Sequence, residues 1–155
     1  MPLPATLRCR IVATGGTKLL NYVRALPPLP VEARLGPPGE APAVTPSETL
    51  LTALGSCLSV HIHANAAAGN IAVHSLEVVA EADVPPSPMW TRPGGPPGPI
   101  GFEAIRVTVH MRADASPQAL QALIAHALLW SPVANTLHDP VHLDVALADL
   151  TGVTA

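Results

Sequence analysis

The 155-residue sequence is poor in charge and in aromatic side chains. Charged residues make up 12% of the chain, well below the usual quarter, and only two Trp, one Tyr and one Phe are present. A core without aromatic residues must be built from Leu, Val, Ile and Ala. A soluble monomer with so little charge is unusual, so we expect a second copy of the chain to cover part of the apolar surface. The length fits one domain over residues 1–155.

Basic residues are also scarce, and they are dispersed along the chain. Lys18 is the only lysine, the arginines are scattered, and the formal net charge is −3. Proteins that bind nucleic acid or anionic membranes gather basic residues on one surface. The composition therefore argues against both kinds of partner.

The sequence lacks a long uninterrupted apolar run. Its most apolar stretch is broken by Ser56, Ser59, His61 and His63, so it does not predict a membrane span. The first residues do not form the apolar run of a signal peptide. These two observations predict a cytoplasmic protein.

Metal-binding and disulfide patterns are missing as well. Cys9 and Cys57 are far apart and form no C-x-x-C pair, which favours two free thiols in a reducing compartment. His61 and His63 would point to different sides of a helix, and Cys57 with His61 would supply only two ligands. We therefore expect neither a metal nor another cofactor.

The pattern of apolar residues predicts strands separated by two helical regions. In the N-terminal region 1–44, alternation predicts strands at 5–14 and 18–25 around Gly15-Gly16, with a short strand at 31–35. Region 70–113 contains two further strands, at 71–84 and 102–113, around a Pro/Gly-rich loop at 85–101, and the last strand is expected at 141–149. This order favours an α+β fold with antiparallel pairing.

Both helical regions carry start signals. Thr45 precedes Pro46, and Glu48 follows three residues later, which predicts a capping box at the start of a helix over 45–69. Gly69 is expected to end that helix as its C′ glycine. Ser116-Pro117 opens the second helical region, 116–139, by the same logic.

The helix over 45–69 also carries a distinctive motif, P-x-E-x-L-L-x-A-L-G-S-C-L, with Cys57 as its cysteine. This motif resembles the first helix of the OsmC/Ohr family, the osmotically inducible and organic hydroperoxide resistance proteins. Weaker likenesses follow in order along the chain, at residues 13–16, 74–78, 101–107 and 131–133. The resemblance implies antiparallel sheets packed around a long central helix and a second helix. It also implies an intertwined homodimer, with sites at the subunit interface where two cysteines reduce organic hydroperoxides.

The sequence departs from that family pattern at three positions. Ser131 stands where the second cysteine is usual, Ser47 where a glutamate is usual, and Thr17 where an activating arginine is usual. Glu48 is one residue beyond the glutamate position. Only Cys57 matches the family's reactive residues directly.

A cysteine reacts with peroxides as its thiolate, so a neighbouring cation would be expected to activate Cys57. His61 lies one helical turn further on, and Lys18, Arg24 and Arg34 are candidates from the preceding segments. Pocket residues are expected among Ser47, Glu48, Arg34 and Trp130. Cys9 falls on the apolar face of its strand, which predicts a buried and inert thiol.

Two functions remain open from the sequence. In the first, Cys57 reduces a small apolar hydroperoxide and an external thiol regenerates it. In the second, the fold is not catalytic, and it binds a small apolar ligand or senses oxidants at the dimer interface. A lone cysteine on an apolar helix is also commonly just a small core residue.

Overall fold

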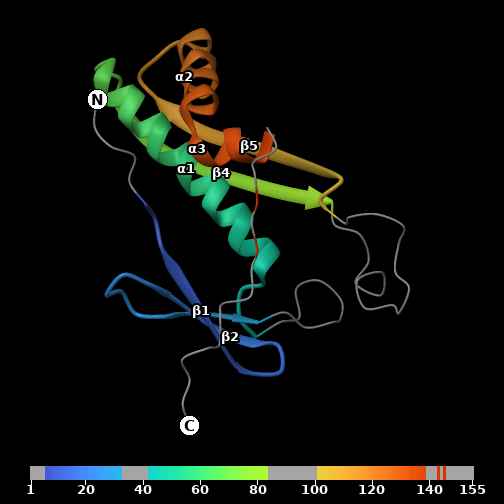
Figure 1. Ribbon diagram of the computed structural model, residues 1–155. Coiled ribbons are helices and arrows are strands. Elements are labelled where there is room, and N and C mark those ends of the chain that lie inside the picture. Colours follow the sequence, from blue (N-terminus) through green and yellow to red (C-terminus); the bar gives the residue numbers. More distant parts are fainter. Residues whose placement is uncertain (1–5, 33–41, 84–100, 139–142, 144, 146–155) are drawn as a thin grey trace.

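The computed structural model describes residues 6–32, 42–83, 101–138, 143 and 145. In chain order the elements are β1 (Cys9–Gly15), β2 (Lys18–Val23), β3 (Leu29–Glu32), α1 (Pro46–Ala68), β4 (Val73–Asp83), β5 (Ala104–Ala113), α2 (Pro117–Trp130) and α3 (Pro132–His138) (Figure 1). This arrangement confirms the predicted α+β class. Arg34, the loop at 85–101 and the predicted strand at 141–149 lie outside the described residues, apart from positions 101, 143 and 145.

The strands form two antiparallel sheets. The first has the order β1-β2-β3, and Asn21 in its central strand pairs with Ile11 and Leu29. The turn from β1 to β2 depends on Gly16, whose φ of 56° lies in the left-handed region that glycine adopts without strain. The second sheet pairs β4 with β5, with Val78 opposite Val109. The predicted hairpin and the predicted strand pair are therefore both confirmed.

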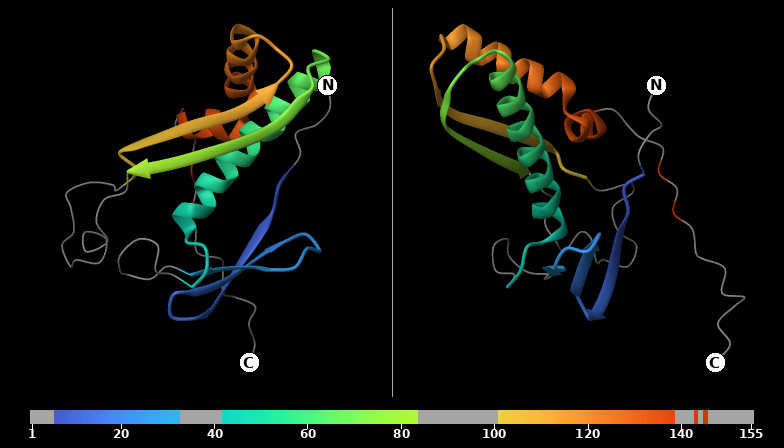
Figure 2. Two further views of the ribbon diagram at one scale, coloured as in Figure 1. Left: turned by 180° about the vertical axis from the view of Figure 1, so that it is seen from behind. Right: turned by 90° about the vertical axis from the view of Figure 1, so that its left-hand side faces the viewer.

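The three helices lie together on one side of the β4–β5 pair, with α1 packed across it (Figure 2). The alternation predicted from the sequence explains this contact, because the apolar residues of β4 and β5 are the more buried ones at every second position. The centre of the core is formed by Leu54 and Leu58 of α1 with Ala134 of α3, against Ile105 and Val107 of β5.

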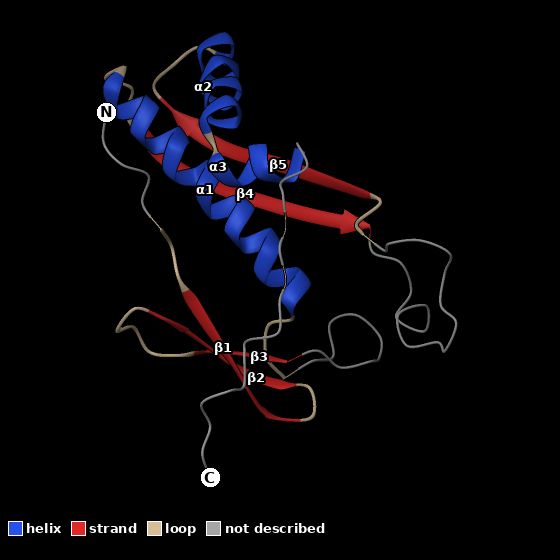
Figure 3. Ribbon diagram, in the orientation of Figure 1, coloured by secondary structure: helices blue, strands red, loops and turns tan. Residues whose placement is uncertain are grey.

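The sheet β1-β2-β3 lies beyond the N-terminal end of α1. It is separated in space from α2, α3 and the β4–β5 pair (Figure 3). A backbone hydrogen bond of 3.1 Å from Glu32 to the carbonyl of Val44 ties β3 to the segment that leads into α1. The residues of β1 are almost all exposed in this single chain. Large apolar side chains such as Ile11, which is 57% exposed, therefore lie on an open surface.

The start of α1 follows the sequence prediction in detail. The Thr45 hydroxyl accepts a hydrogen bond from the backbone N–H of Glu48, and the Glu48 carboxylate accepts one from the backbone N–H of Thr45. These two bonds form the predicted capping box and satisfy backbone groups that the first turn leaves without helical partners. Ser116 caps α2 in the same way, through a 3.2 Å bond from the N–H of Ala119.

The end of α1 differs from the prediction by one residue. Gly69 has a φ of −88° and is the C-cap, whereas Asn70 has the left-handed φ of 53° expected at C′. The N–H of Asn70 donates to the carbonyl of Ala67, and the N–H of Ile71 donates to the carbonyl of Ala66. These bonds form a Schellman motif, in which asparagine replaces glycine because its short polar side chain tolerates the left-handed region. In the described part of the chain, no helix is long and apolar enough to cross a membrane.

Candidate functional site

Cys57 lies near the middle of α1, and the residue is partly exposed. The sulfur accepts a hydrogen bond of 3.1 Å from the hydroxyl of Ser131, which lies between α2 and α3. The structure therefore places Ser131, the residue at the family's second-cysteine position, directly against Cys57. The resemblance had linked these two positions, and the packing of α3 on α1 brings them into contact.

Ser131 also holds α3 in place. It is fully buried, at 0% exposure, and its Oγ accepts a hydrogen bond of 3.2 Å from the N–H of Ala134. Its carbonyl accepts a 3.0 Å bond from the N–H of Asn135. Ser131 is thus the N-cap of α3, and Pro132 in the first helical position suits that role.

A row of polar and aromatic side chains extends from Cys57 along the contact between α1 and α2. His61 is partly buried one turn beyond Cys57, and one turn further the Asn65 amide lies 2.6 Å from Nδ1 of His126. The His126 ring stacks on Trp130, with ring centroids 5.9 Å apart. Because Cys57 meets the C-terminal end of α2 and Asn65 meets its middle, the two helices run in opposite directions. Trp130 is 61% exposed, so it borders this row from the solvent side.

The remaining predicted site residues lie elsewhere in the described chain. Lys18 and Arg24 belong to the region of the β1-β2-β3 sheet, and both are exposed. Ser47 and Glu48 lie in the first turn of α1, with Glu48 about 13 Å along the helix axis from Cys57 and on the opposite side. Among the described residues, no cationic side chain is hydrogen-bonded to the Cys57 sulfur.

Glu48 serves the helix cap rather than the thiol. Hydrogen bonds from the backbone N–H and the hydroxyl of Thr45 lower the pKa of its carboxyl group below the ordinary value of 4.5. These donors stabilise the charged carboxylate at the positive end of the helix, where an acidic side chain is favoured. The cap thereby accounts for both its position and its ionisation.

The prediction for Cys9 is wrong for this chain, because its thiol is exposed. Six of the seven residues of β1 are exposed, and none of the described elements covers its apolar face. Alternation shows that a strand has an apolar side. It does not show whether another layer of the same chain packs on that side.

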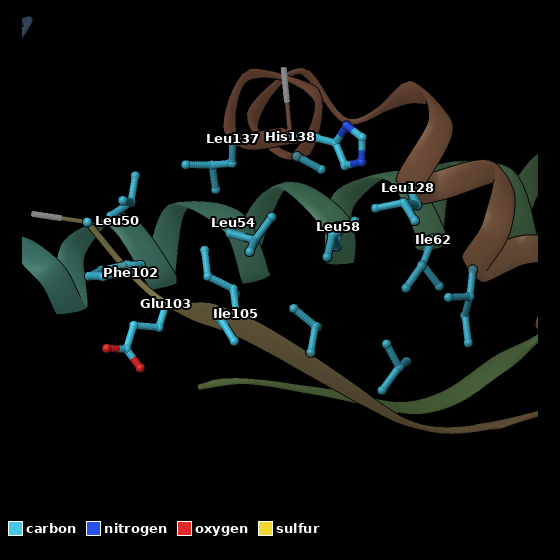
Figure 4. Close-up of a pocket in the computed structure, with 16 residues that line it drawn as sticks. Leu50, Leu54, Leu58, Ile62, Phe102, Glu103, Ile105, Leu128, Leu137 and His138 are labelled. Carbon is cyan, nitrogen blue, oxygen red and sulfur yellow. The ribbon is translucent and has the colours of Figure 1, made fainter. Parts of the chain in front are cut away.

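A large apolar groove lies between α1, β5, α2 and α3 (Figure 4). Its volume is about 710 Å³, and its walls include Leu50, Leu54 and Leu58 of α1. In Figure 4, Leu54 and Leu58 of α1 lie across the groove from β5, which carries Ile105. Cys57 is not among the lining residues, although it immediately precedes Leu58.

These groove residues were not predicted as part of the site. The signal was the row of apolar residues at four-residue spacing, Leu50, Leu54, Leu58 and Ile62. Such a row is also the ordinary pattern of a core helix, so the sequence alone did not distinguish a wall of a cavity from packed interior. In the described residues, no group of three His, Cys, Asp or Glu side chains could hold a metal ion.

Comparison with known proteins identifies the family of this chain. Residues 38–146 match the family described as OsmC-like protein. The chain therefore belongs to the OsmC-like family. The match covers α1, both strands of the second sheet and the Ser131 region. A comparison with curated proteins finds no match.

Solved structures of OsmC-like proteins share the fold. An OsmC-like protein from Mycoplasma pneumoniae is similar with a TM-score of 0.74 and 18% identity, over 89% of this chain and 91% of that one. A Legionella pneumophila protein is described as an organic hydroperoxide resistance protein and predicted redox protein. Its TM-score is 0.63 at 18% identity, over 88% of this chain and 91% of that one. An organic hydroperoxide resistance protein from Elizabethkingia anophelis has a TM-score of 0.63 at 17% identity, over 90% of this chain and 93% of that one. At these identities the likeness establishes the shared architecture.

Proposed function

We propose that this OsmC-like protein is a thiol-dependent reductase of small apolar organic hydroperoxides, with Cys57 as its single peroxidatic cysteine. The observation that carries the proposal is the position of Cys57, a partly exposed cysteine in the family's motif with a hydroxyl donor on its sulfur. The relatives described as hydroperoxide resistance proteins support the same chemistry. The adjoining groove offers apolar surface for an alkyl group.

The reaction would have two stages. The Cys57 thiolate attacks the terminal oxygen of the hydroperoxide, the O–O bond breaks, and the alkoxide takes up a proton to leave as an alcohol. Cys57 becomes a sulfenic acid. An external thiol then attacks that sulfur and releases water, and a second external thiol reduces the mixed disulfide. The external thiols supply both electrons because Ser131 has no thiol with which to form an internal disulfide.

The active form in this proposal is a homodimer. Leu128, Leu129 and Trp130 at the end of α2 are 55%, 67% and 61% exposed, next to the position of Ser131. An apolar patch of this kind favours contact with another protein surface. A second copy would also offer a cover for the exposed face of β1. We accordingly place the site at a subunit interface in the cytoplasm, where a reducing thiol pool is available.

Peroxide turnover tests this function directly. Purified protein should consume cumene hydroperoxide with a dithiol reductant, whereas Cys57→Ser should show only the rate of the reductant alone. Cys9→Ser is the matched control, because it removes the other thiol and should retain activity. Equal rates for wild type and Cys57→Ser would refute the proposal.

The groove also favours a second candidate, a protein that binds a small apolar molecule without turnover. The specific observation is that the 710 Å³ groove is lined without Cys57. In that case an apolar fluorescent probe should bind with equal affinity to wild type and Cys57→Ser, and Leu54→Gln should weaken binding. Binding of the probe with no peroxide consumption would select this candidate.

A further inference from the structure

We propose that Ser131 is a positioning residue that holds the Cys57 sulfur in its reactive form, through the hydrogen bond that its hydroxyl donates. The inference concerns the ionisation of Cys57, and its link to catalysis rests on the proposed function. It assigns an active role to a residue that occupies the place of a missing cysteine.

The Ser131 hydroxyl makes a second hydrogen bond besides the one with the Cys57 sulfur. A serine hydroxyl has one proton to donate and two lone pairs that accept. The N–H of Ala134 already occupies one lone pair, at 3.2 Å. The hydroxyl keeps its proton and one lone pair for its other contact, the Cys57 sulfur at 3.1 Å. An ionised sulfur has no proton, so in that state only the Ser131 hydroxyl can donate across this contact.

The burial of Ser131 increases the energetic importance of its hydrogen bond to Cys57. Ser131 is 0% exposed, so its hydroxyl has no access to bulk water. A buried donor without a good acceptor is costly, and a neutral thiol is only a weak acceptor. A thiolate is a strong acceptor, and hydrogen bonds to charged groups are roughly twice as strong as those between neutral groups. The hydroxyl therefore gains more from the thiolate than from the thiol, which favours ionised Cys57.

Other titratable groups near Cys57 must be separated from this effect. On α1 the closest along the chain is His61, on α2 it is His126, and on α3 it is His138. His126 is engaged with the Asn65 amide and stacked on Trp130. The charged residues of the β4–β5 pair, including Glu77, Glu81, Arg106 and Arg112, lie on its exposed face, away from α1. His61 is thus the group whose charge most needs a control.

The test measures how the alkylation rate of Cys57 by iodoacetamide depends on pH, in a Cys9→Ser background so that only one thiol reacts. Ser131→Ala removes the donor, and we expect the half-maximal rate to move to a pH about one unit higher. At about pH 7 the rate should fall about five- to tenfold. Ser131→Thr retains a hydroxyl and should restore the wild-type profile.

Loss of the α3 cap is controlled separately. Ser116→Ala removes an equivalent cap from α2 without touching the thiol, and its profile should match wild type. Ser131→Gly removes the hydroxyl but keeps a residue that caps helices well, so it replaces Ser131→Ala if that variant does not fold. The charge of His61 is controlled by adding His61→Gln to both the wild type and Ser131→Ala. The difference in half-maximal pH between these two proteins should persist.

The outcomes distinguish this inference from the proposed function. Identical profiles for wild type, Ser131→Ala and Ser131→Gly would overturn the role of Ser131 even if the protein consumes peroxide. A shift in the Ser131 variants alone supports that role even if peroxide consumption is absent. A shift of the same size in Ser116→Ala would assign the effect to helix capping and would also overturn the inference.

Discussion

The Ser131 hydroxyl donates a hydrogen bond of 3.1 Å to the Cys57 sulfur, although 74 positions separate the two residues in the chain. A buried serine at the end of α2 thus contacts the cysteine of α1. Ser131 supplies a hydrogen-bond donor to the sulfur, but it has no thiol with which Cys57 could form a disulfide.

The same geometry predicts that Ser131→Cys restores a disulfide. The present separation must shorten by about 1 Å to reach a normal S–S bond, a distance that a small change in side-chain rotation covers. After treatment with one equivalent of hydroperoxide, the variant should lose two hydrogens in intact mass, and peptide mapping should link Cys57 to residue 131. The matched protein with Cys9→Ser added should behave identically. A free thiol at residue 131 after oxidation would contradict the prediction.

Stability should depend strongly on which face of α1 is changed. Ile62 is 0% exposed, so Ile62→Ala leaves a cavity and should lower the free energy of unfolding by about 2–4 kcal/mol. Val60 on the same helix is 65% exposed, and Val60→Ala should change the free energy of unfolding by no more than about 0.5 kcal/mol. Urea denaturation of both variants at equal protein concentration provides the comparison. Similar losses in the two would show that Val60 is covered in solution, as a dimer contact would require.

The capping box should make stability depend on pH. The folded-state pKa of Glu48 is lowered, so its contribution is complete above the unfolded value of 4.5 and is lost as the pH falls through the lower folded value. Glu48→Gln should therefore differ from wild type in free energy of unfolding at about pH 7, and the difference should shrink at about pH 3. Chemical denaturation at the two pH values measures it.

Thr45→Ala provides the companion variant, because it removes the hydroxyl that accepts from the backbone N–H of Glu48. We expect a loss of about 1 kcal/mol at neutral pH. A difference between wild type and Glu48→Gln that is the same at both pH values would show that the carboxylate does not stabilise the cap.

The end of α1 predicts opposite effects for neighbouring substitutions. Gly69 has a negative φ, and a Cβ added there would meet the Asn65 carbonyl oxygen at 3.5 Å, an ordinary contact. Gly69→Ala should therefore be neutral or should stabilise the protein by up to about 1 kcal/mol. Asn70 has the left-handed φ, so Asn70→Ala should destabilise it by about 1 kcal/mol. Thermal unfolding of the two variants tests the order, and the reverse order would contradict the assigned C-cap.

Local patterns in the sequence predicted most of the fold. The Thr45 and Ser116 caps, the turn at Gly15-Gly16 and the alternation of β4 and β5 are all confirmed, because each depends on residues close together in the chain. The assignment of the left-handed residue to Gly69 was wrong. Both glycine and asparagine adopt that conformation, and the hydrogen bonds at the helix end decide between them.

The candidate site was less accessible to such reasoning. The motif around Cys57 singled out the candidate residue and the family, and Ser131 stood out only as a substitution in the family pattern. The exposure of Cys9 and the separation of Lys18 from the helix layer were not predicted. Both depend on which surfaces meet, and an apolar strand face is the same in sequence whether or not another layer covers it.

The sequence by itself determined the elements, their caps and the cysteine that could react, because hydrophobic periodicity and local hydrogen bonding act over a few residues. Only the tertiary structure decided which residue touches that cysteine and where the apolar groove opens. Those contacts join segments distant in the chain, such as α1 and the junction of α2 with α3. They are fixed by the packing of whole helices on a sheet rather than by any local pattern.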